Sequence, residues 1–280
     1  MTAEPLGTPI TGPTALGDSF RRFAQLSWTL AVTDFKLRFF GSVLGYLWQL
    51  MRPLLLFGVL YFVFTQFVRI GGGVDFFPVV LLTNIVLFTF FAEGTGAVNS
   101  VVERENLVRK IQFPRLAIPV STVLTAAFNL TLNAVVILIF ALASGVRPHS
   151  TWLLLPVFLL ALILLVLGFA MLLSALFVRY RDVKPIWEVV LQMTFYGTPI
   201  IYAIETIDAA AGVKEAIMLN PLAAIVQEVR HAVIDPDAPT AFAIVGNDLL
   251  LLIPAATIVG VFALGFWVFS REAPRIAEEL

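Results

Sequence analysis

The chain has 280 residues, of which 59% are hydrophobic and 13% are charged, with a formal net charge of −1. A soluble domain carries roughly a quarter charged residues, so this composition predicts an all-α protein that crosses a membrane several times. Cysteine is absent, which excludes disulfides, thiolate metal sites and cysteine nucleophiles. The sequence contains no P-loop, no His-carboxylate cluster and no nucleophile constellation, so we expect no catalytic residue, metal site or cofactor in this chain.

The N-terminal region divides into a tail and a helix. Residues 1–17 are rich in Thr, Pro and Gly, which predicts a disordered cytoplasmic tail. Residues 18–40 have the period of an amphipathic helix with a basic polar face, which we expect to lie in the membrane interface; the alternative is a soluble helix packed on a partner. The predicted apolar face comprises Phe20, Ala24, Trp28, Val32, Phe35 and Phe39.

Residues 18–280 form one predicted membrane domain with six spans between residues 43 and 269 and a short tail at 270–280. The spans are 43–67, 76–99, 116–144, 152–177, 185–203 and 249–269. In the first span, Arg52 could snorkel to the cytoplasmic edge, which we expect, or face a wet cavity. In the third span, Asn129 and Asn133 share a face and should hydrogen-bond to a neighbouring helix.

Residues 204–248 are neither a clean span nor a clean loop. The apolar stretch 216–226 is too short to cross a bilayer, and Asn220-Pro221 interrupts it. We therefore predict re-entrant external helices that form an exit gate; the alternative is a hairpin lying flat on the membrane. The predicted channel-lining and gate residues are Tyr46, Phe195, Tyr196, Tyr202, Asn220 and Pro221.

The orientation follows from the 18 Lys and Arg residues, most of which fall on one side of this topology. The positive-inside rule then predicts that both termini are cytoplasmic. On that side, residues 101–119 form a charged island between two apolar spans, with acidic residues before basic ones and Pro114 near its end. The island is predicted to be a short docking helix or, alternatively, an ordinary cytoplasmic loop.

Five motifs in register resemble the membrane subunit of a type-2 ABC exporter of the polysaccharide-export class. They are residues 38–48 with Pro53, residues 106–115, residues 180–183, residues 198–202, and residues 220–222 with Arg230. The resemblance implies a homodimer that binds two ATPase subunits, which hold ATP and Mg²⁺, and that exports lipid-linked polysaccharide such as O-antigen, teichoic acid or capsule. It also implies a multi-pass protein of the bacterial cytoplasmic membrane, in contact with membrane lipid and without a nucleic-acid partner. Glu93 and Arg52 depart from the family pattern, which leaves the charge of the pore wall open.

The resemblance also implies two sets of site residues. The ATPase-coupling residues would be Arg104, Asn106, Leu107, Arg109, Lys110 and Phe113. The cytoplasmic entrance would be formed by Arg38, Trp48, Arg181 and Asp182. Two other classes share parts of this pattern: a type-2 ABC exporter of drugs or small lipids, and a membrane-bound scaffold.

Overall fold

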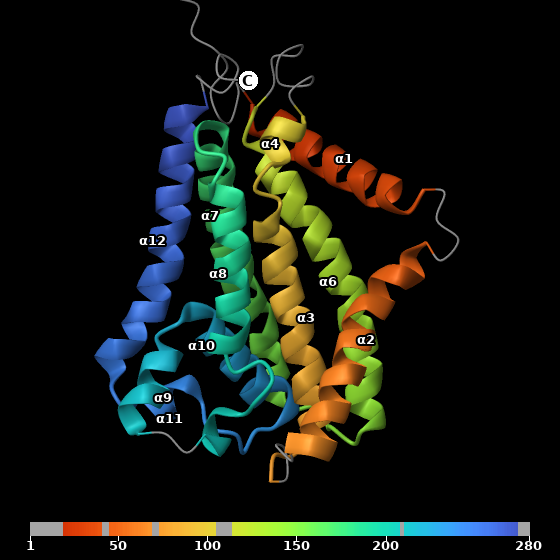
Figure 1. The fold of residues 1–280 in the computed structure, drawn as a ribbon, viewed down its shortest axis with the longest axis vertical. Coiled ribbons are helices and arrows are strands. Elements are labelled where there is room, and N and C mark those ends of the chain that lie inside the picture. Colours follow the sequence, from red (N-terminus) through yellow and green to blue (C-terminus); the bar gives the residue numbers. More distant parts are fainter. Residues whose placement is uncertain (1–18, 41–44, 69–72, 105–113, 208–209, 274–280) are drawn as a thin grey trace, which may run out of the picture.

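The computed structural model describes residues 19–40, 45–68, 73–104, 114–207 and 210–273, and within these ranges every regular element is a helix (Figure 1). The predicted all-α class is confirmed. The long helices are α1 (Phe20–Phe39), α2 (Tyr46–Val63), α3 (Phe77–Gly96), α6 (Ala117–Ala143), α7 (Leu155–Arg179), α8 (Val183–Gly197) and α12 (Asp248–Glu272). The shorter helices and turns are η1 (Phe64–Val68), α4 (Ser100–Glu103), η2 (Ser150–Leu154), η3 (Ile204–Thr206), α9 (Ala211–Met218), α10 (Pro221–Val229), η4 (Arg230–Ile234) and α11 (Ala241–Val245).

Five helical stretches in the described residues are long and apolar enough to cross a membrane. They are Tyr46–Phe67, Phe77–Gly96, Ala117–Ala143, Ser150–Arg179 and Leu249–Glu272. The predicted fifth span is shorter than expected, because α8 ends at Gly197 after 15 residues, or about 22 Å at 1.5 Å per residue. The start of α1 and the end of α12 nevertheless lie at the same end of the bundle, so the chain needs the return that α8 makes (Figure 1). The count of six crossings stays a prediction.

Helix α3 lies at the centre of the bundle and packs against α2, α6, α7 and α8. It is apolar on all sides, and 72% of its span is buried inside the protein, far more than in any other candidate span. A helix that is hydrophobic all round is suited to this central position. Because α3 is packed on most sides, it forms a fixed part of the bundle.

Helices α7 and α12 run in close backbone contact. A Cβ atom added to Gly265 would lie 2.2 Å from the carbonyl oxygen of Gly168, and one added to Gly168 would lie 2.7 Å from the backbone nitrogen of Phe262. Small residues at such crossings let two helices approach closely enough for extensive van der Waals contact.

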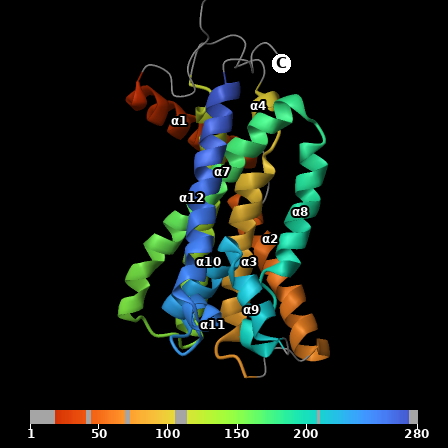
Figure 2. The same cartoon turned by 90° about the vertical axis from the view of Figure 1, so that its left-hand side faces the viewer.

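Helix α1 lies across one end of the bundle against α6 (Figures 1 and 2). Its buried row is Phe23, Ser27 and Ala31, while Phe20 and Trp28 remain 75% and 56% exposed. The predicted helix is confirmed, and its aromatic face packs on the bundle in part, because the rings of Trp28 and Phe35 lie 5.2 and 5.6 Å from the Phe128 ring of α6. The small residues Ser27 and Ala31 permit close contact with α6, while most of the Phe20 and Trp28 surface remains accessible to lipid or a partner.

The outer segment, comprising α9, α10, η4 and α11, packs at the opposite end of the bundle against α7 and α12 (Figure 2). Ala223 is fully buried, and Ala224, Ile225 and Val226 are at most 8% exposed. The segment is therefore packed into the protein, which is compatible with the predicted re-entrant helices and with a hairpin that lies against the end of the bundle. How deeply the segment enters the membrane stays a prediction.

Candidate functional site

Two adjoining cavities form a groove along α2, α3 and α8. One has a volume of about 490 Å³ and the other about 410 Å³, and Arg52, Ala92 and Glu93 line both. The first extends along Leu56, Phe88, Leu191, Gln192, Phe195 and Tyr196. The second extends along Arg38, Gly45, Trp48, Gln49 and Gly96. We refer to the two cavities together as the α2–α8 groove.

Aromatic contacts hold α8 on α3 and α7. The buried Trp187 ring lies 5.0 Å from the Phe169 ring, and its Nε1 donates a hydrogen bond of 3.2 Å to Thr95 Oγ1. Two residues before Gly197, the Phe195 ring packs edge-on against Phe88, with the ring centroids 5.0 Å apart. Such ring pairs contribute beyond the area they bury, so α8 is fixed to α3 near both of its ends.

Glu93 joins three helices through its carboxylate. Gln49 Nε2 from α2 donates to Oε1 and Asn129 Nδ2 from α6 donates to Oε2, each at 2.7 Å. The prediction that Asn129 bonds to a neighbouring helix is confirmed. For Asn133 it is wrong, because Asn133 Nδ2 donates to the carbonyl oxygen of Asn129 in its own helix. A charge within a membrane bundle needs such partners, because unpaired carboxylates are costly there.

Arg52 lines both cavities of the α2–α8 groove, which agrees with the cavity alternative, and its predicted snorkelling to the cytoplasmic edge stays a prediction. Within the described residues, neither Arg52 nor Arg38 has a carboxylate at ion-pair distance. Glu93 lines the same cavities, and each of its oxygens accepts one hydrogen bond from an amide. Among the described residues, the groove therefore presents two guanidinium groups that have no carboxylate at ion-pair distance.

The α2–α8 groove brings together residues that the sequence analysis assigned to opposite ends of the path. Arg38 and Trp48, predicted at the cytoplasmic entrance, line one cavity, and Phe195 and Tyr196, predicted at the exit, line the other.

The other predicted lining residues lie outside these two cavities. Tyr46 stacks on Phe35 of α1 with the ring centroids 5.3 Å apart. Arg181 lies with its guanidinium 5.0 Å from the Phe177 ring, and Asp182 precedes the first residue of α8.

Three predicted gate residues lie near the end of α8 or at the start of α10, and one of them, Asn220, connects the outer segment to the end of α8. Asn220 caps α10 by accepting a hydrogen bond from the Leu222 backbone nitrogen, and its Nδ2 donates to Thr198 Oγ1 at 3.3 Å. Pro221 is the first residue of α10, a position where its missing N–H costs nothing. Tyr202 donates its hydroxyl to the Tyr196 carbonyl oxygen at 3.4 Å. The interruption of the apolar stretch at Asn220-Pro221 is therefore the capped start of α10.

Of the predicted ATPase-coupling residues, the described part of the chain contains Arg104. Its guanidinium forms an ion pair with Asp34 of α1 and donates a hydrogen bond of 3.0 Å to Ser121 Oγ of α6. Arg104 therefore ties the start of the charged island to the α1 helix. The remaining predicted residues, Asn106, Leu107, Arg109, Lys110 and Phe113, lie outside the described residues.

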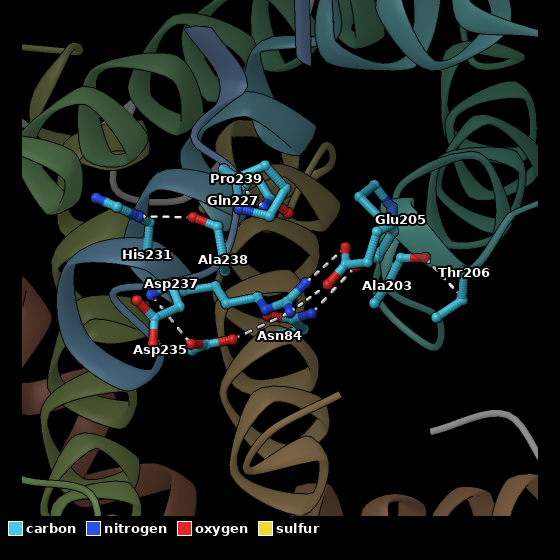
Figure 3. A network of polar contacts seen from close by, with 12 residues as sticks. Asn84, Ala203, Glu205, Thr206, Gln227, His231, Asp235, Asp237, Ala238 and Pro239 are labelled. Atoms are coloured by element: carbon cyan, nitrogen blue, oxygen red, sulfur yellow. Dashed lines mark hydrogen bonds and ion pairs between the residues drawn. The ribbon is translucent and has the colours of Figure 1, made fainter. Parts of the chain in front are cut away.

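The sequence analysis missed a buried ionic network in the outer segment (Figure 3). Arg230 is 3% exposed and contacts the carboxylates of Glu205 and Asp235. Burial alone would raise the pKa of the Glu205 carboxyl, but the hydrogen bonds and positive charge of Arg230 bring the net pKa below its ordinary value. The sequence signal that could have indicated this network is Arg230 itself, which lies close to an apolar stretch too short to cross a membrane.

The fold and groove define a polytopic helical membrane protein whose polar groups line a cavity between helices. The sequence model of the ABC-2 type transporter family matches residues 25–234. The chain belongs to this family, which confirms the resemblance found in the motifs.

Two individual relatives of this chain have a more specific name than the family does. The chain is 28% identical over 234 residues to "O-antigen export system permease protein RfbA" of Myxococcus xanthus, covering 82% of this chain and 89% of that protein. It is 29% identical over 195 residues to a Klebsiella pneumoniae protein of the same name, covering 69% of this chain and 74% of that protein.

Proposed function

We propose that this chain is the transmembrane subunit of an ATP-driven exporter that moves lipid-linked O-antigen polysaccharide across the bacterial cytoplasmic membrane. The observation that carries the proposal is the α2–α8 groove, where Trp48 and Tyr196 offer rings and Arg38 and Arg52 offer cations along one path. Ring faces suit the C–H surfaces of sugars, and they bind without specific hydrogen bonds that would slow the release of each unit. The names of the two relatives favour this function over export of drugs or small lipids.

The groove is open on one side of the single chain, and we propose that a second copy closes it into a channel. Helix α2 is barely buried, with 11% of its span covered, and it exposes Leu55, Val59 and Phe62. Helix α8 exposes Ile186, Val189 and Met193. Facing copies would enclose the polar wall of the groove and leave the apolar edges for helix contact or lipid.

ATP hydrolysis is assigned to a separate ATPase subunit, two copies of which would bind the homodimer with their own ATP and Mg²⁺. The proposed docking site is the charged island, residues 101–119, whose described neighbour α4 lies at the end of the bundle where α1 lies. The ion pair between Arg104 and Asp34 supports this arrangement, because movement of the island would then act directly on α1. This chain itself would perform no catalysis.

The proposed orientation places both termini in the cytoplasm and the turn before η2 outside. Because the chain has no cysteine, His149→Cys provides one exposed thiol in that turn. A membrane-impermeant maleimide should label it in intact cells. Labelling only after the membrane is broken would contradict the orientation.

Deletion of the gene tests the function. The account predicts that polysaccharide accumulates inside the cell on its lipid carrier while the surface loses it, and that wild-type protein restores export. A Tyr196→Ala protein should restore export only in part, whereas Phe242→Ala, on α11 away from the groove, should restore it fully. Unchanged surface polysaccharide in the deletion strain, with altered drug resistance or lipid content, would favour the alternative class.

A further inference from the structure

We infer that Glu188 of one copy of this chain forms an ion pair with Arg52 of a second copy, and that two such pairs, related by the two-fold axis of the dimer, close the cytoplasmic part of the channel between transport cycles. The inference deepens the proposed function and rests on the homodimer proposed there.

Glu188 lies on the side of α8 that borders the α2–α8 groove. It precedes Leu191 and Gln192, which line the groove, by three and four residues and therefore shares a helix face with them. The rotation of α8 is fixed because Trp187, the preceding residue, is buried and donates a hydrogen bond to Thr95 of α3. Glu188 is exposed, so its carboxylate extends the wall of the groove toward the end of the bundle where α8 begins.

Glu188 also lies near the level of the cationic part of the groove. Helix α3 provides the common reference, since Trp187 of α8 bonds to Thr95 and Gln49 of α2 bonds to the same helix two residues earlier. Arg52 follows Gln49 by three residues and lines both cavities. Along the bundle, Arg52 and Glu188 are therefore separated by about one helical turn, ~5 Å, a difference that the long arginine side chain spans.

Opposite charges remain without ion-pair partners on the two walls of the groove. Among the described residues, Glu188 has no cation at ion-pair distance, and Arg52 has no carboxylate. Lys184 lies one turn before Glu188 on α8 but is not close enough to pair with it. A charge within a membrane span requires a partner or water. The charges of Arg52 and Glu188 complement each other.

A second copy brings these two charges together twice. In a two-fold symmetric dimer the same surface of each copy forms the contact, so α2 of one copy faces α8 of the other at two equivalent places. Within one chain, α2 and α8 each pack on α3, on either side of the groove, and both expose apolar residues there. The two ion pairs lie across the channel near its cytoplasmic end, where they narrow a path that would otherwise admit ions.

The ion pair acts on closure of the channel and not on folding of the chain. An ion pair that is accessible to water contributes little to the free energy of unfolding, so Glu188→Gln should leave the stability of the chain unchanged. During transport the pair separates, because the glycan occupies the same space.

A cross-link between two differently tagged chains tests the contact. One chain carries Arg52→Cys and the other carries Glu188→Cys, and neither has a native cysteine. The two are co-expressed with the ATPase subunits, and inverted membrane vesicles without ATP are treated with a short bifunctional thiol reagent. A product that carries both tags is expected, and it should decrease during ATP-driven transport. As the control, Val157→Cys, at an exposed position on α7, replaces Glu188→Cys and should give no such product.

Charge reversal tests the closure. Arg52→Glu or Glu188→Arg places like charges on facing helices, so each should raise severalfold the passive proton leak of proteoliposomes that hold the complex without ATP. The two reversals in the same chain should bring the leak back to the wild-type rate, a rescue that a loss of packing would not show. Lys36→Glu, an exposed change on α1 outside the groove, is the control and should leave the leak unchanged.

The outcomes separate the ion pair from the dimer. Tagged chains that co-purify without giving the cross-linked product would overturn the inference and leave the proposed dimer intact. Chains that do not co-purify would overturn both the dimer and the ion pair. Single reversals that cause no leak, or a double reversal that still leaks, would show that the pair does not close the channel.

Discussion

Arg230 donates to both carboxylate oxygens of Glu205, with Nη1 at 3.0 Å from Oε2 and Nη2 at 2.5 Å from Oε1. Glu205 lies in η3, just after α8, and Arg230 opens η4 in the outer segment, so the pair joins the end of α8 to the helices that follow it (Figure 3). Asn84 reinforces the same region by donating to the carbonyl oxygens of Pro199 and Ile200. The end of α8 and the outer segment should therefore move as one body.

Loss of Arg230 should destabilise the protein strongly. The side chain is 3% exposed, and its removal leaves the Asp235 carboxylate, 10% exposed, without its cation. Breaking a buried pair in this way costs about 3–5 kcal/mol. We expect Arg230→Met to lower the midpoint of thermal unfolding of the purified protein well below that of Arg147→Met, a control at an exposed outer position. Equal midpoints for the two variants would show that the network does not stabilise the fold.

The same pair predicts an acid-sensitive contribution to stability. Arg230 holds the pKa of Glu205 below its ordinary value, so the ionised carboxylate stabilises the folded state at pH values above about 4.3. This contribution is lost as the pH falls through the lowered folded-state pKa. The stability difference between wild type and Glu205→Gln should therefore be constant from about pH 7 to pH 5 and shrink in more acidic buffer. Glu215→Gln, which lies outside the network, should show no such convergence, and a difference that grows on acidification would contradict the assignment.

Much of the helix pattern was predictable from sequence because lipid imposes a simple rule: long apolar runs must be helices. The predicted helix at 18–40 and the predicted spans at 76–99 and 116–144 agree with α1, α3 and α6 within a few residues. The span at 185–203 was overestimated because the run of apolar residues continues past Gly197, where the backbone leaves the helix and Asn84 binds the freed carbonyl groups.

The site was predictable only in part, for a physical reason. Rings and charges in the spans were visible, which is why Trp48 and Tyr196 were selected, but sequence does not give the partner of a side chain. Glu93 contacts residues 44 and 36 positions away, and Arg230 contacts one 25 positions away. Likewise, the amphipathic pattern of α1 predicted a helix in the membrane interface but did not indicate that Phe23, Ser27 and Ala31 are its buried row.

Glu93→Gln should destabilise the bundle although it removes a charge from the membrane. The carboxylate accepts from Gln49 Nε2 and Asn129 Nδ2, and a glutamine amide would turn an N–H₂ donor toward one of these two donors. An unsatisfied buried donor costs about 1–3 kcal/mol. Thermal unfolding should show this loss relative to Glu188→Gln, a control on the exposed face of α8. Wild-type stability for Glu93→Gln would mean that the three helices do not depend on this carboxylate.

Gly265→Ala should separate α7 from α12. The added Cβ would lie 2.2 Å from the Gly168 carbonyl oxygen, a backbone atom that cannot rotate away. Gly260 lies on the same helix, and a Cβ added there meets no atom within 4 Å. We expect Gly265→Ala to lower stability by about 1–3 kcal/mol, as overpacking does, and Gly260→Ala to be neutral or slightly stabilising. Similar unfolding midpoints for both variants would contradict the close helix contact.

The central claim is that the α2–α8 groove forms the path of the exported glycan, and photo-cross-linking during transport tests it most directly. A photoreactive phenylalanine analogue replaces Phe195, which lines the groove, or Phe242, which is 52% exposed on α11 outside it. The account predicts polysaccharide adducts at position 195 that require ATP and the ATPase subunit, and none at position 242. Export that proceeds normally without adducts at position 195, or with equal adducts at both positions, would contradict the account.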